Sequence, residues 1–414
     1  MELDPARQAS ADPNRAKRAK RGPLTGVLVI ALEQAVAAPL ATRTLADLGA
    51  RVIKVEHPVL GDFTRRYDAV ARGMAAHFVW LNRGKESVGL DLSRPAGLEA
   101  LHALLARADI CVSNLGPGAT QRLGIGPEDL AARYPRLIGI EISGYGNGGP
   151  LSGKRAYDLL IQAEAGACAV TGRPGEPAKP GPPYADTGSG LYAAIAALGA
   201  LTERASTGRG QHIQVSMFDT AVDLMGYPLT WTRYAGADQQ PAGMGSPAVA
   251  PYGAYPTADG RTVVLGTTND GEWQRLTLKM LDRADLAAEP KYARNDGRVR
   301  CRAELDAVLA AWCASHTLAQ IQDAAEAAGI GNAVYRTPTE VIEHPHLAAR
   351  DRWAEVATPG GPVCLPVPPV MFGARDAVMG PVPGLGEHTE AVLAELGVSI
   401  DPPATATEPK GELT

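Results

Sequence analysis

The strongest constraint on the fold is a repeated alternation of short apolar runs with helical segments that begins at Gly26. The apolar runs have the length of buried strands and occupy residues 27–32, 51–56, 109–114, 137–142 and 211–216. Helical patterns at residues 37–48 and 98–107 separate the first of them. Strands that alternate with helices form right-handed βαβ crossovers around a parallel sheet. The sequence therefore predicts an α/β fold with a Rossmann-like parallel sheet.

The loops after these strands are the expected ligand site, because open α/β sheets bind ligands at the carboxyl ends of their strands. Residues 33–39, 56–61 and 114–118 fall there. The third loop reads Asn-Leu-Gly-Pro-Gly, so its backbone amides can approach a ligand closely, and the guanidinium of Arg122 could meet a phosphate. Asn114 alone is equally typical of a simple turn. No GxGxxG follows the first strand and no Walker A lysine is present, which argues against NAD, against ATP and against a dehydrogenase.

The chain is too long, at 414 residues, for one ordinary core. Its composition predicts a basic tail (1–21), a large Rossmann-like domain (22–236), a linker with a smaller α+β domain (237–346), a C-terminal segment (347–400) and a second tail (401–414). Both tails are expected to be disordered, because they are polar and have no apolar periodicity.

Composition excludes several classes of partner. The net charge is −5 and no global basic excess points to nucleic acid. No apolar stretch approaches the ~18–20 residues of a membrane span. The five cysteines lack a CxxC motif or a Cys/His cluster, so we expect reduced thiols, a cytoplasmic location and no metal site.

An acidic residue follows the most glycine-rich loop of the chain. Residues 143–153 hold this loop, and Asp158 then opens a helical run of small residues. Asp158 can be read as an acid that caps a helix or lies in its first turn. It can also be read as a base or nucleophile beside a loop of free amides. Spacing alone leaves both interpretations open.

The neighbours of Asp158 have similar alternatives. Gln162 lies one helical turn along on the same face and could orient the carboxylate. Tyr145 and Tyr157 are expected to pack, although Tyr145 could touch substrate. Asp186 could support the site or simply cap a helix.

The order of short motifs along the chain resembles the family III CoA-transferases, the group of formyl-CoA transferase and carnitine CoA-transferase. The motifs that carry this resemblance are residues 45–56, Gly61-Asp62, residues 82–87, 90–92, Ala108-Asp109, residues 114–118, 122–124, 142–146, Tyr157-Asp158, residues 207–211 and 386–388. Each motif is weak alone, but together they cover most of the chain in the order of the family.

The resemblance implies that the chain exchanges CoA between an acyl-CoA and a free carboxylic acid, with Asp158 as the nucleophile. It also implies that the C-terminal segment returns to the large domain and that two subunits interlock as a homodimer. Such an exchange is close to thermoneutral, so coenzyme A is a substrate and no metal, nicotinamide or ATP is needed. The resemblance further implies a set of CoA-binding residues: Gln34, Val36, Ala37, His57, Leu90, Asn114, Leu115, Gly116 and Arg122.

Two departures from formyl-CoA transferases concern the site. Gln34 falls two places earlier than the glutamine of that subgroup, and the run of four glycines that shields the carboxylate there is missing. Gly243-Met244-Gly245 is the nearest substitute. Residues 31–39 and 78–87 look like the branch associated with dicarboxylates such as succinate, itaconate, mesaconate or citramalate. Candidates for the cation that would meet the free end of a dicarboxylate are Arg43, Arg72 and Arg233.

Two alternatives remain at this stage. The related α-methylacyl-CoA racemase shares the fold and the aspartate but needs a second acid/base partner, a histidine before the strand at residues 137–142. No histidine occurs from residue 103 to residue 211, which favours the transferase. A non-catalytic CoA-binding protein is disfavoured because Asp158 is present.

Overall fold

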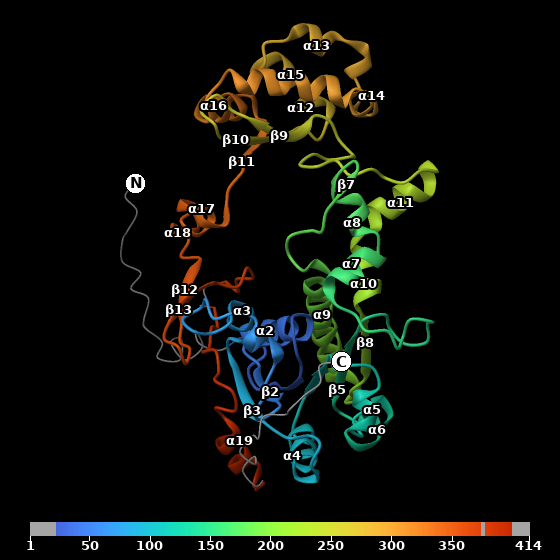
Figure 1. The fold of residues 1–414 in the computed structure, drawn as a ribbon, viewed down its shortest axis with the longest axis vertical. Coiled ribbons are helices and arrows are strands. Elements are labelled where there is room, and N and C mark those ends of the chain that lie inside the picture. The colour runs from blue at the N-terminus through green and yellow to red at the C-terminus, as the bar shows by residue number, and fades with distance from the viewer. Residues whose placement is uncertain (1–21, 374–376, 400–414) are drawn as a thin grey trace, which may run out of the picture. The chain divides into compact units, whose positions relative to one another are not determined.

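The computed structural model describes residues 22–373 and 377–399, so both predicted tails lie outside the described residues. Contacts between Cα atoms divide the chain into two compact units (Figure 1). Of the described residues, the first unit contains those up to 162, residues 182–224 and those from 350 onward, and the second contains residues 163–181 and 225–349. This division assigns residues 163–181 and 225–236 to the second unit, whereas the sequence prediction grouped them with the large domain.

The first unit is built on a six-stranded sheet with the order β3-β2-β1-β4-β5-β8. All five pairings in it are parallel. Its strands are β1 (Leu28–Leu32), β2 (Arg51–Glu56), β3 (Lys85–Gly89), β4 (Ile110–Ser113), β5 (Ile138–Ser143) and β8 (His212–Ser216). The predicted Rossmann-like parallel sheet is confirmed. The sequence pattern missed β3, because this strand begins Lys-Glu-Ser and its polar residues hide the apolar signal.

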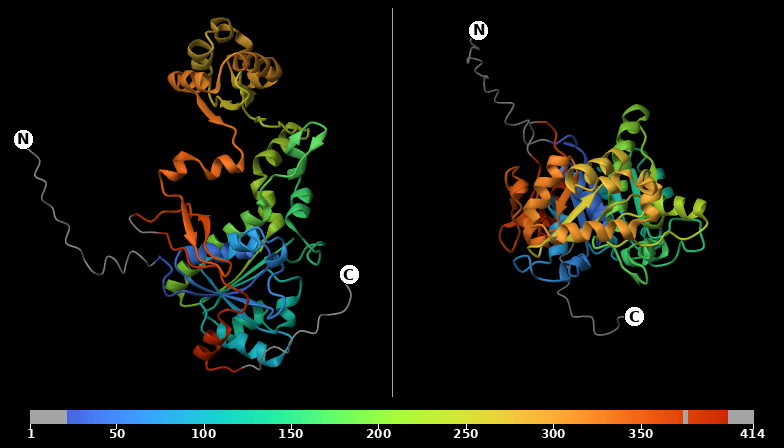
Figure 2. Two further views of the ribbon diagram at one scale, coloured as in Figure 1. Left: turned by 60° about the vertical axis from the view of Figure 1, so that its left-hand side comes forward. Right: turned by 90° about the horizontal axis from the view of Figure 1, so that it is seen from above.

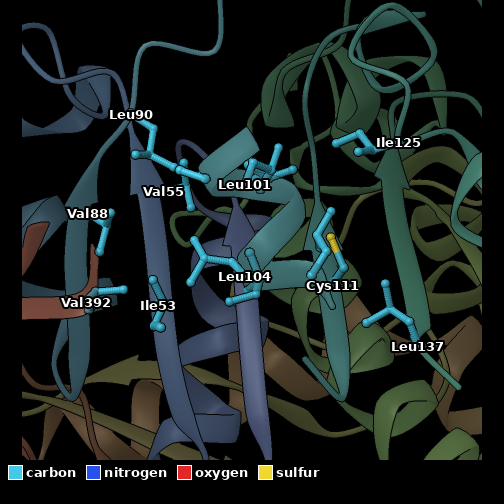
Figure 3. Packing of buried hydrophobic residues seen from close by; sticks show 14 of the residues in the cluster. Ile53, Val55, Val88, Leu90, Leu101, Leu104, Cys111, Ile125, Leu137 and Val392 are labelled. Carbon is cyan, nitrogen blue, oxygen red and sulfur yellow. The ribbon is translucent and has the colours of Figure 1, made fainter. Parts of the chain in front are cut away.

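One face of the sheet carries the main hydrophobic core. Leu101 and Leu104 project from α4 (Pro95–Leu105) onto the strands, and Val392 of α19 (Thr389–Leu396) lies beside Val88 of β3 (Figure 3). These side chains are almost completely buried, and each such side chain contributes roughly 1.5–3 kcal/mol through the apolar surface that it removes from water. The core therefore ties the last helix of the chain to the first strands.

The opposite face is covered by α2 (Ala37–Asp47) and the 24-residue α9 (Tyr184–Thr207), which pack closely on each other. A Cβ atom at Gly190 of α9 would lie 2.5 Å from the carbonyl oxygen of Ala37, so only glycine permits this approach. Near the other end of α9, Arg204 donates to the carbonyl oxygens of Asp109 and Arg136, which precede β4 and β5. Consequently α9 begins at the carboxyl edge of the sheet and ends at its amino edge.

The C-terminal segment packs on this sheet domain. The hairpin of β12 (Trp353–Val356) and β13 (Val363–Pro366) shares an apolar cluster with α3 (Ala76–Asn82). Further along, the backbone N–H of Gly84 donates to the carbonyl oxygen of Pro381, and that of His388 donates to Ser87. In Figure 1 and in the left view of Figure 2 the segment, orange to red, runs beside the blue N-terminal part of the sheet domain. The expected return of the C-terminal segment to the large domain is thus observed.

The second unit has its own core around an antiparallel sheet of order β11-β10-β9. Its elements include β9 (Tyr252–Pro256), β10 (Thr262–Gly266), β11 (Gly331–Val334), α11 (Gly226–Ala235), α12 (Asp270–Arg275), η2 (Leu276–Met280), α13 (Ala284–Ala288), η3 (Pro290–Tyr292), α14 (Asn295–Arg300), α15 (Arg302–Ala314), α16 (Leu318–Ala328), α17 (Pro338–Ile342) and α18 (Pro345–Ala348). Hence the smaller α+β fold is confirmed.

Shorter elements complete the chain. They are η1 (Phe63–Arg66), α5 (Ala119–Arg122), α6 (Pro127–Arg133), α7 (Asp158–Glu164), α8 (Ala167–Val170), β6 (Gly172–Arg173), β7 (Glu176–Pro177) and α10 (Met217–Leu224). Within the described ranges, no helix is both long enough and apolar enough to cross a bilayer.

Candidate active site

Asp158 is the first residue of α7, and its carboxylate is held by groups from two helices. Its Oδ1 accepts the backbone N–H of Ala185 at 3.1 Å and that of Asp186 at 3.3 Å, both in the first turn of α9. The side-chain amide of Gln162 donates to Oδ2 at 2.6 Å. Asp158 therefore does accept helix N–H groups, as one interpretation expected, but they belong to α9 rather than to its own helix. The partial positive charge of a helix N-terminus favours the ionised carboxylate there.

Gln162 holds Asp158 from a fully buried position. Its Oε1 is also buried and accepts no hydrogen bond from the described residues. A buried amide oxygen without a donor is uncommon, so the amide can accept a hydrogen bond from a further group at this place.

The glycine-rich loop after β5 approaches Asp158 along the backbone. A Cβ atom at Gly144 would lie 2.3 Å from the Cβ of Ala156, so glycine is required for this contact. The ring of Tyr145 packs 5.7 Å from that of Phe218, and the Lys154 ammonium lies 5.3 Å from the Tyr145 ring centre. The Tyr145 hydroxyl is buried and has no hydrogen-bond partner among the described residues. The ring of Tyr145 thus packs against Phe218, while its hydroxyl can still form a hydrogen bond with a further group.

Two of the predicted CoA-binding loops are joined by a reciprocal pair of hydrogen bonds. The backbone N–H of Gln34 donates to Asn114 Oδ1 at 2.9 Å, and Asn114 Nδ2 donates to the Gln34 carbonyl oxygen at 2.7 Å. These residues follow β1 and β4, which are neighbours at the point where the strand order reverses. Open α/β sheets bind ligands at this crevice. Asn114 is therefore more than a turn residue, since it fixes the loop after β1.

A buried ionic cluster lies beneath the loop after β1. Lys85 Nζ donates to Glu33 Oε1 at 2.6 Å, and Lys54 Nζ contacts Glu33 at 3.3 Å and Asp62 at 2.9 Å, all with fully buried side chains. Asp62 Oδ1 also accepts the backbone N–H of Ala35 at 3.4 Å, and Ala35 has a left-handed φ of 63°. The cluster therefore holds the backbone on both sides of Gln34.

Charge compensation keeps this cluster ionised. Burial alone would raise the pKa of Glu33, but the charges of Lys85 and Lys54 outweigh it and lower that pKa. Burial depresses the pKa of Lys54, but Glu33 and Asp62 outweigh this effect and raise it. Burial lowers the pKa of Lys85 to about 8 although Glu33 opposes it. Sequence reasoning missed the cluster, and the available signal was Lys54 in the middle of an otherwise apolar strand.

The remaining predicted CoA-binding residues divide into buried and exposed groups. Val36, Ala37 and Leu90 are buried, with Leu90 in the core, so their side chains shape the sheet edge. His57 is exposed, and its Nδ1 accepts the backbone N–H groups of Val59 and Leu60. These residues lie after β1, β2 and β3, at the carboxyl edge.

Arg122 lies beside the glycines of the loop after β4. A Cβ atom at Gly118, which has a φ of 71°, would lie 3.1 Å from Arg122 Nη1. Gly116 and Arg122 are exposed, and Leu115 packs partly against the core. The guanidinium and the open glycine backbone therefore lie together on the surface.

The candidate cations differ in how far their side chains are buried. Arg43 Nη1 donates to the carbonyl oxygen of Trp80, and burial lowers its pKa to about 10. Arg72 and Arg233 are exposed, and Arg233 belongs to the second unit. Gly243 and Gly245 are also in the second unit. Asp158 and Gln162, by contrast, contact each other within the first unit.

Comparisons with known proteins agree on one family. The sequence profile of CoA-transferase family III matches residues 24–389. A succinate–glutarate CoA-transferase of Agrobacterium fabrum is 32% identical over 93% of this chain and 97% of its own length. A succinyl-CoA–D-citramalate CoA-transferase of Chloroflexus aurantiacus is 32% identical over 90% of this chain and 94% of its own length.

The fold agrees with the same assignment. The crystal structure of a CAIB/BAIF family protein from Brucella suis has a TM-score of 0.79 and 33% identity, and the match covers 91% of this chain and 100% of that one. Because the family profile and the relatives span nearly the whole described chain, this protein is a CoA-transferase that belongs to CoA-transferase family III.

Proposed function

We propose that this chain transfers CoA from succinyl-CoA, or a similar acyl-CoA donor, to a free dicarboxylic acid with four or five carbons. The observation that carries the proposal is the carboxylate of Asp158, held by the first N–H groups of α9 and by Gln162 at the carboxyl edge of the sheet. Relatives named as succinyl-CoA-dependent transferases of glutarate and citramalate support the choice of substrates.

In the proposed mechanism, Asp158 stores the activation of the thioester covalently. An oxygen of Asp158 bonds to the acyl carbon of the donor, and the carbon–sulfur bond breaks to give an aspartyl–acyl anhydride and free CoA. The sulfur then attacks the carbonyl carbon of Asp158 and releases the donor acid. The acceptor carboxylate attacks the resulting aspartyl-CoA thioester, and CoA resolves the second anhydride to product.

The side chains around Asp158 would support these steps. Gln162 would keep the carboxylate aligned, and the Tyr145 hydroxyl and the glycine-rich backbone after β5 would supply donors for the tetrahedral oxyanions. The edge formed by Gln34, His57, Asn114 and the glycine loop beside Arg122 would bind CoA. Of the candidate cations in the first unit, the exposed Arg72 would be available to a distal carboxylate.

The test of this function is acyl exchange without ATP. Purified protein is incubated with succinyl-CoA or acetyl-CoA and with a panel of mono- and dicarboxylic acids, and new thioesters are identified by mass spectrometry. We expect a CoA ester of a four- or five-carbon dicarboxylate. No exchange with any pair, together with exchange of the α-hydrogen of a branched acyl-CoA, would instead indicate the racemase.

The interlocked homodimer is a further part of the proposal. Leu191, Ile195 and Leu198 form an exposed apolar stripe along α9, with Ile195 62% exposed. Extended exposed apolar surface of this kind is typical of protein interfaces. Light scattering of the purified protein should give the mass of two chains, and a single-chain mass at micromolar concentration would argue against the dimer.

The five cysteines are all free thiols, which supports the expected reducing, cytoplasmic compartment.

A further inference from the structure

A second carboxyl group lies beside Asp158, at the same helix end. Asp186 belongs to the first turn of α9, and its own backbone N–H donates to Asp158 Oδ1 at 3.3 Å. An acid in the first turn of a helix usually interacts with the free N–H groups there. Here Asp158 accepts the N–H groups of Ala185 and Asp186, so the positively polarised start of α9 is already engaged by another carboxylate.

The groups around Asp186 do not balance a second negative charge. Tyr67 interacts electrostatically with Asp186 and contributes a phenol, and the start of α2, packed on the start of α9, is apolar. The helix α10, which packs on α9, contributes Asp223, and this carboxylate accepts a hydrogen bond from Tyr192. None of these groups is a lysine or an arginine. Burial and the charge of Asp158 consequently raise the pKa of Asp186 to about 7.

We propose that Asp186 is the proton-carrying partner of Asp158, so that the two carboxyl groups share one negative charge that changes place during the reaction. This inference rests on the proposed function, in which Asp158 becomes acylated. In the free enzyme the charge is on Asp158 and the proton on Asp186. When Asp158 is acylated it loses its charge, and the repulsion that helps to keep Asp186 protonated is removed.

The proton transfers balance in each step. As the oxygen of Asp158 bonds to the acyl carbon, the electron pair of the carbon–sulfur bond goes to sulfur, and sulfur takes the proton of Asp186. The products are an anhydride, neutral CoA thiol and ionised Asp186. When the sulfur then attacks the carbonyl carbon of Asp158, its proton returns to Asp186 and the donor carboxylate leaves. The second half of the exchange repeats both transfers, and no proton enters or leaves overall.

The substitution Asp186→Asn tests this role, because asparagine preserves the size, the neutral charge and the backbone N–H but has no proton to give. We expect kcat for acyl exchange at pH 6 to fall by about 10²-fold or more, the scale of a lost general acid, with KM for the acyl-CoA unchanged. In the wild type, kcat/KM should fall as the pH rises through about 7, where Asp186 loses its proton. The variant should lack this decline, so its deficit should shrink between pH 6 and pH 8.

Stability gives an independent readout of the same group. A carboxyl group whose pKa is raised on folding binds more protons in the folded chain than in the unfolded one. The free energy of unfolding therefore falls as the pH rises from about 4 to about 7. Asp186→Asn should therefore raise the melting temperature relative to wild type at pH 8 more than at pH 5. An equal shift at both pH values would contradict the protonated state.

The outcomes separate this inference from the proposed function. Mass spectrometry of the tryptic peptide 156–204, with fragmentation to locate the modified residue, should detect an adduct on Asp158 in the wild type after incubation with succinyl-CoA. No wild-type adduct would reject the covalent function itself. An adduct in the wild type, together with an Asp186→Asn variant that has the same kcat and the same pH profile, would reject only the role of Asp186.

A conservative variant covers the case in which Asp186→Asn does not fold, as judged by circular dichroism. Asp186→Glu retains the acid, and we expect it to keep the decline of kcat/KM with pH and to lose no more than about tenfold in kcat. A folded Asp186→Glu without that decline would overturn the proposal. The exposed Asp323 of α16 serves as the matched control, and Asp323→Asn should change neither rate nor pH profile.

Discussion

Replacing Asp158 by asparagine should reduce acyl exchange by roughly 10⁴-fold or more, the scale at which covalent enzymes lose activity without their nucleophile. Asparagine retains a carbonyl oxygen that can accept the N–H groups of Ala185 and Asp186. Gln162 can turn its amide so that the buried Oε1, which now accepts no described hydrogen bond, faces the new side-chain amide. The variant should therefore fold and bind acyl-CoA while it fails to react. Exchange is measured with succinyl-CoA, and binding of CoA by calorimetry.

Comparison with Asp158→Ala separates chemistry from structure. Alanine removes both the nucleophile and the acceptor at the start of α9, and loss of a helix cap costs about 1 kcal/mol. Both variants should thus be inactive, but only the alanine variant should lose stability. Asp323→Asn, the exposed control on α16, should retain full exchange. Turnover of Asp158→Asn within tenfold of wild type would exclude Asp158 as the nucleophile.

Replacing Glu33 by glutamine should destabilise the sheet domain by about 3–5 kcal/mol, because it removes one partner of a buried ionic cluster. Glu33 is fully buried and contacts Lys54 at 3.3 Å and Lys85 at 2.6 Å. Without its charge, both lysines remain in the core with too little negative charge to balance them. Urea denaturation followed by circular dichroism should show the lower midpoint. Surviving folded protein should also have a higher KM for acyl-CoA, since Glu33 is adjacent to Gln34.

Two further variants identify the cause of the loss. Adding Lys85→Met to Glu33→Gln removes an uncompensated cation, so the double variant should recover part of the lost stability. Asp285→Asn breaks the pair of Arg283 and Asp285, whose side chains are 44% and 62% exposed, and should cause no measurable change. A Glu33→Gln midpoint equal to that of wild type would show that the cluster does not support the fold.

The sequence by itself determined most of the architecture. Strands β1, β2, β4, β5 and β8 could be read from apolar runs, because buried parallel strands need apolar residues on both faces. The order of the motifs along the chain also indicated Asp158 as the nucleophile and the loops after β1 and β4 as CoA-binding segments. Each of these apolar runs lies within one short segment of the chain, so the local sequence is sufficient to detect the strand.

Only the tertiary structure decided how charged and polar residues are used. The pattern missed β3 because Lys85 and Glu86 look like surface residues, and the partners that make a buried Lys85 possible lie on other strands. Whether Asp158 caps a helix was likewise undecidable from spacing, because the helix that it caps begins more than twenty residues later. Hydrogen bonds and charge pairs between distant segments depend on which segments fold together, and that is set by the packing of α9 against the sheet rather than by neighbouring residues.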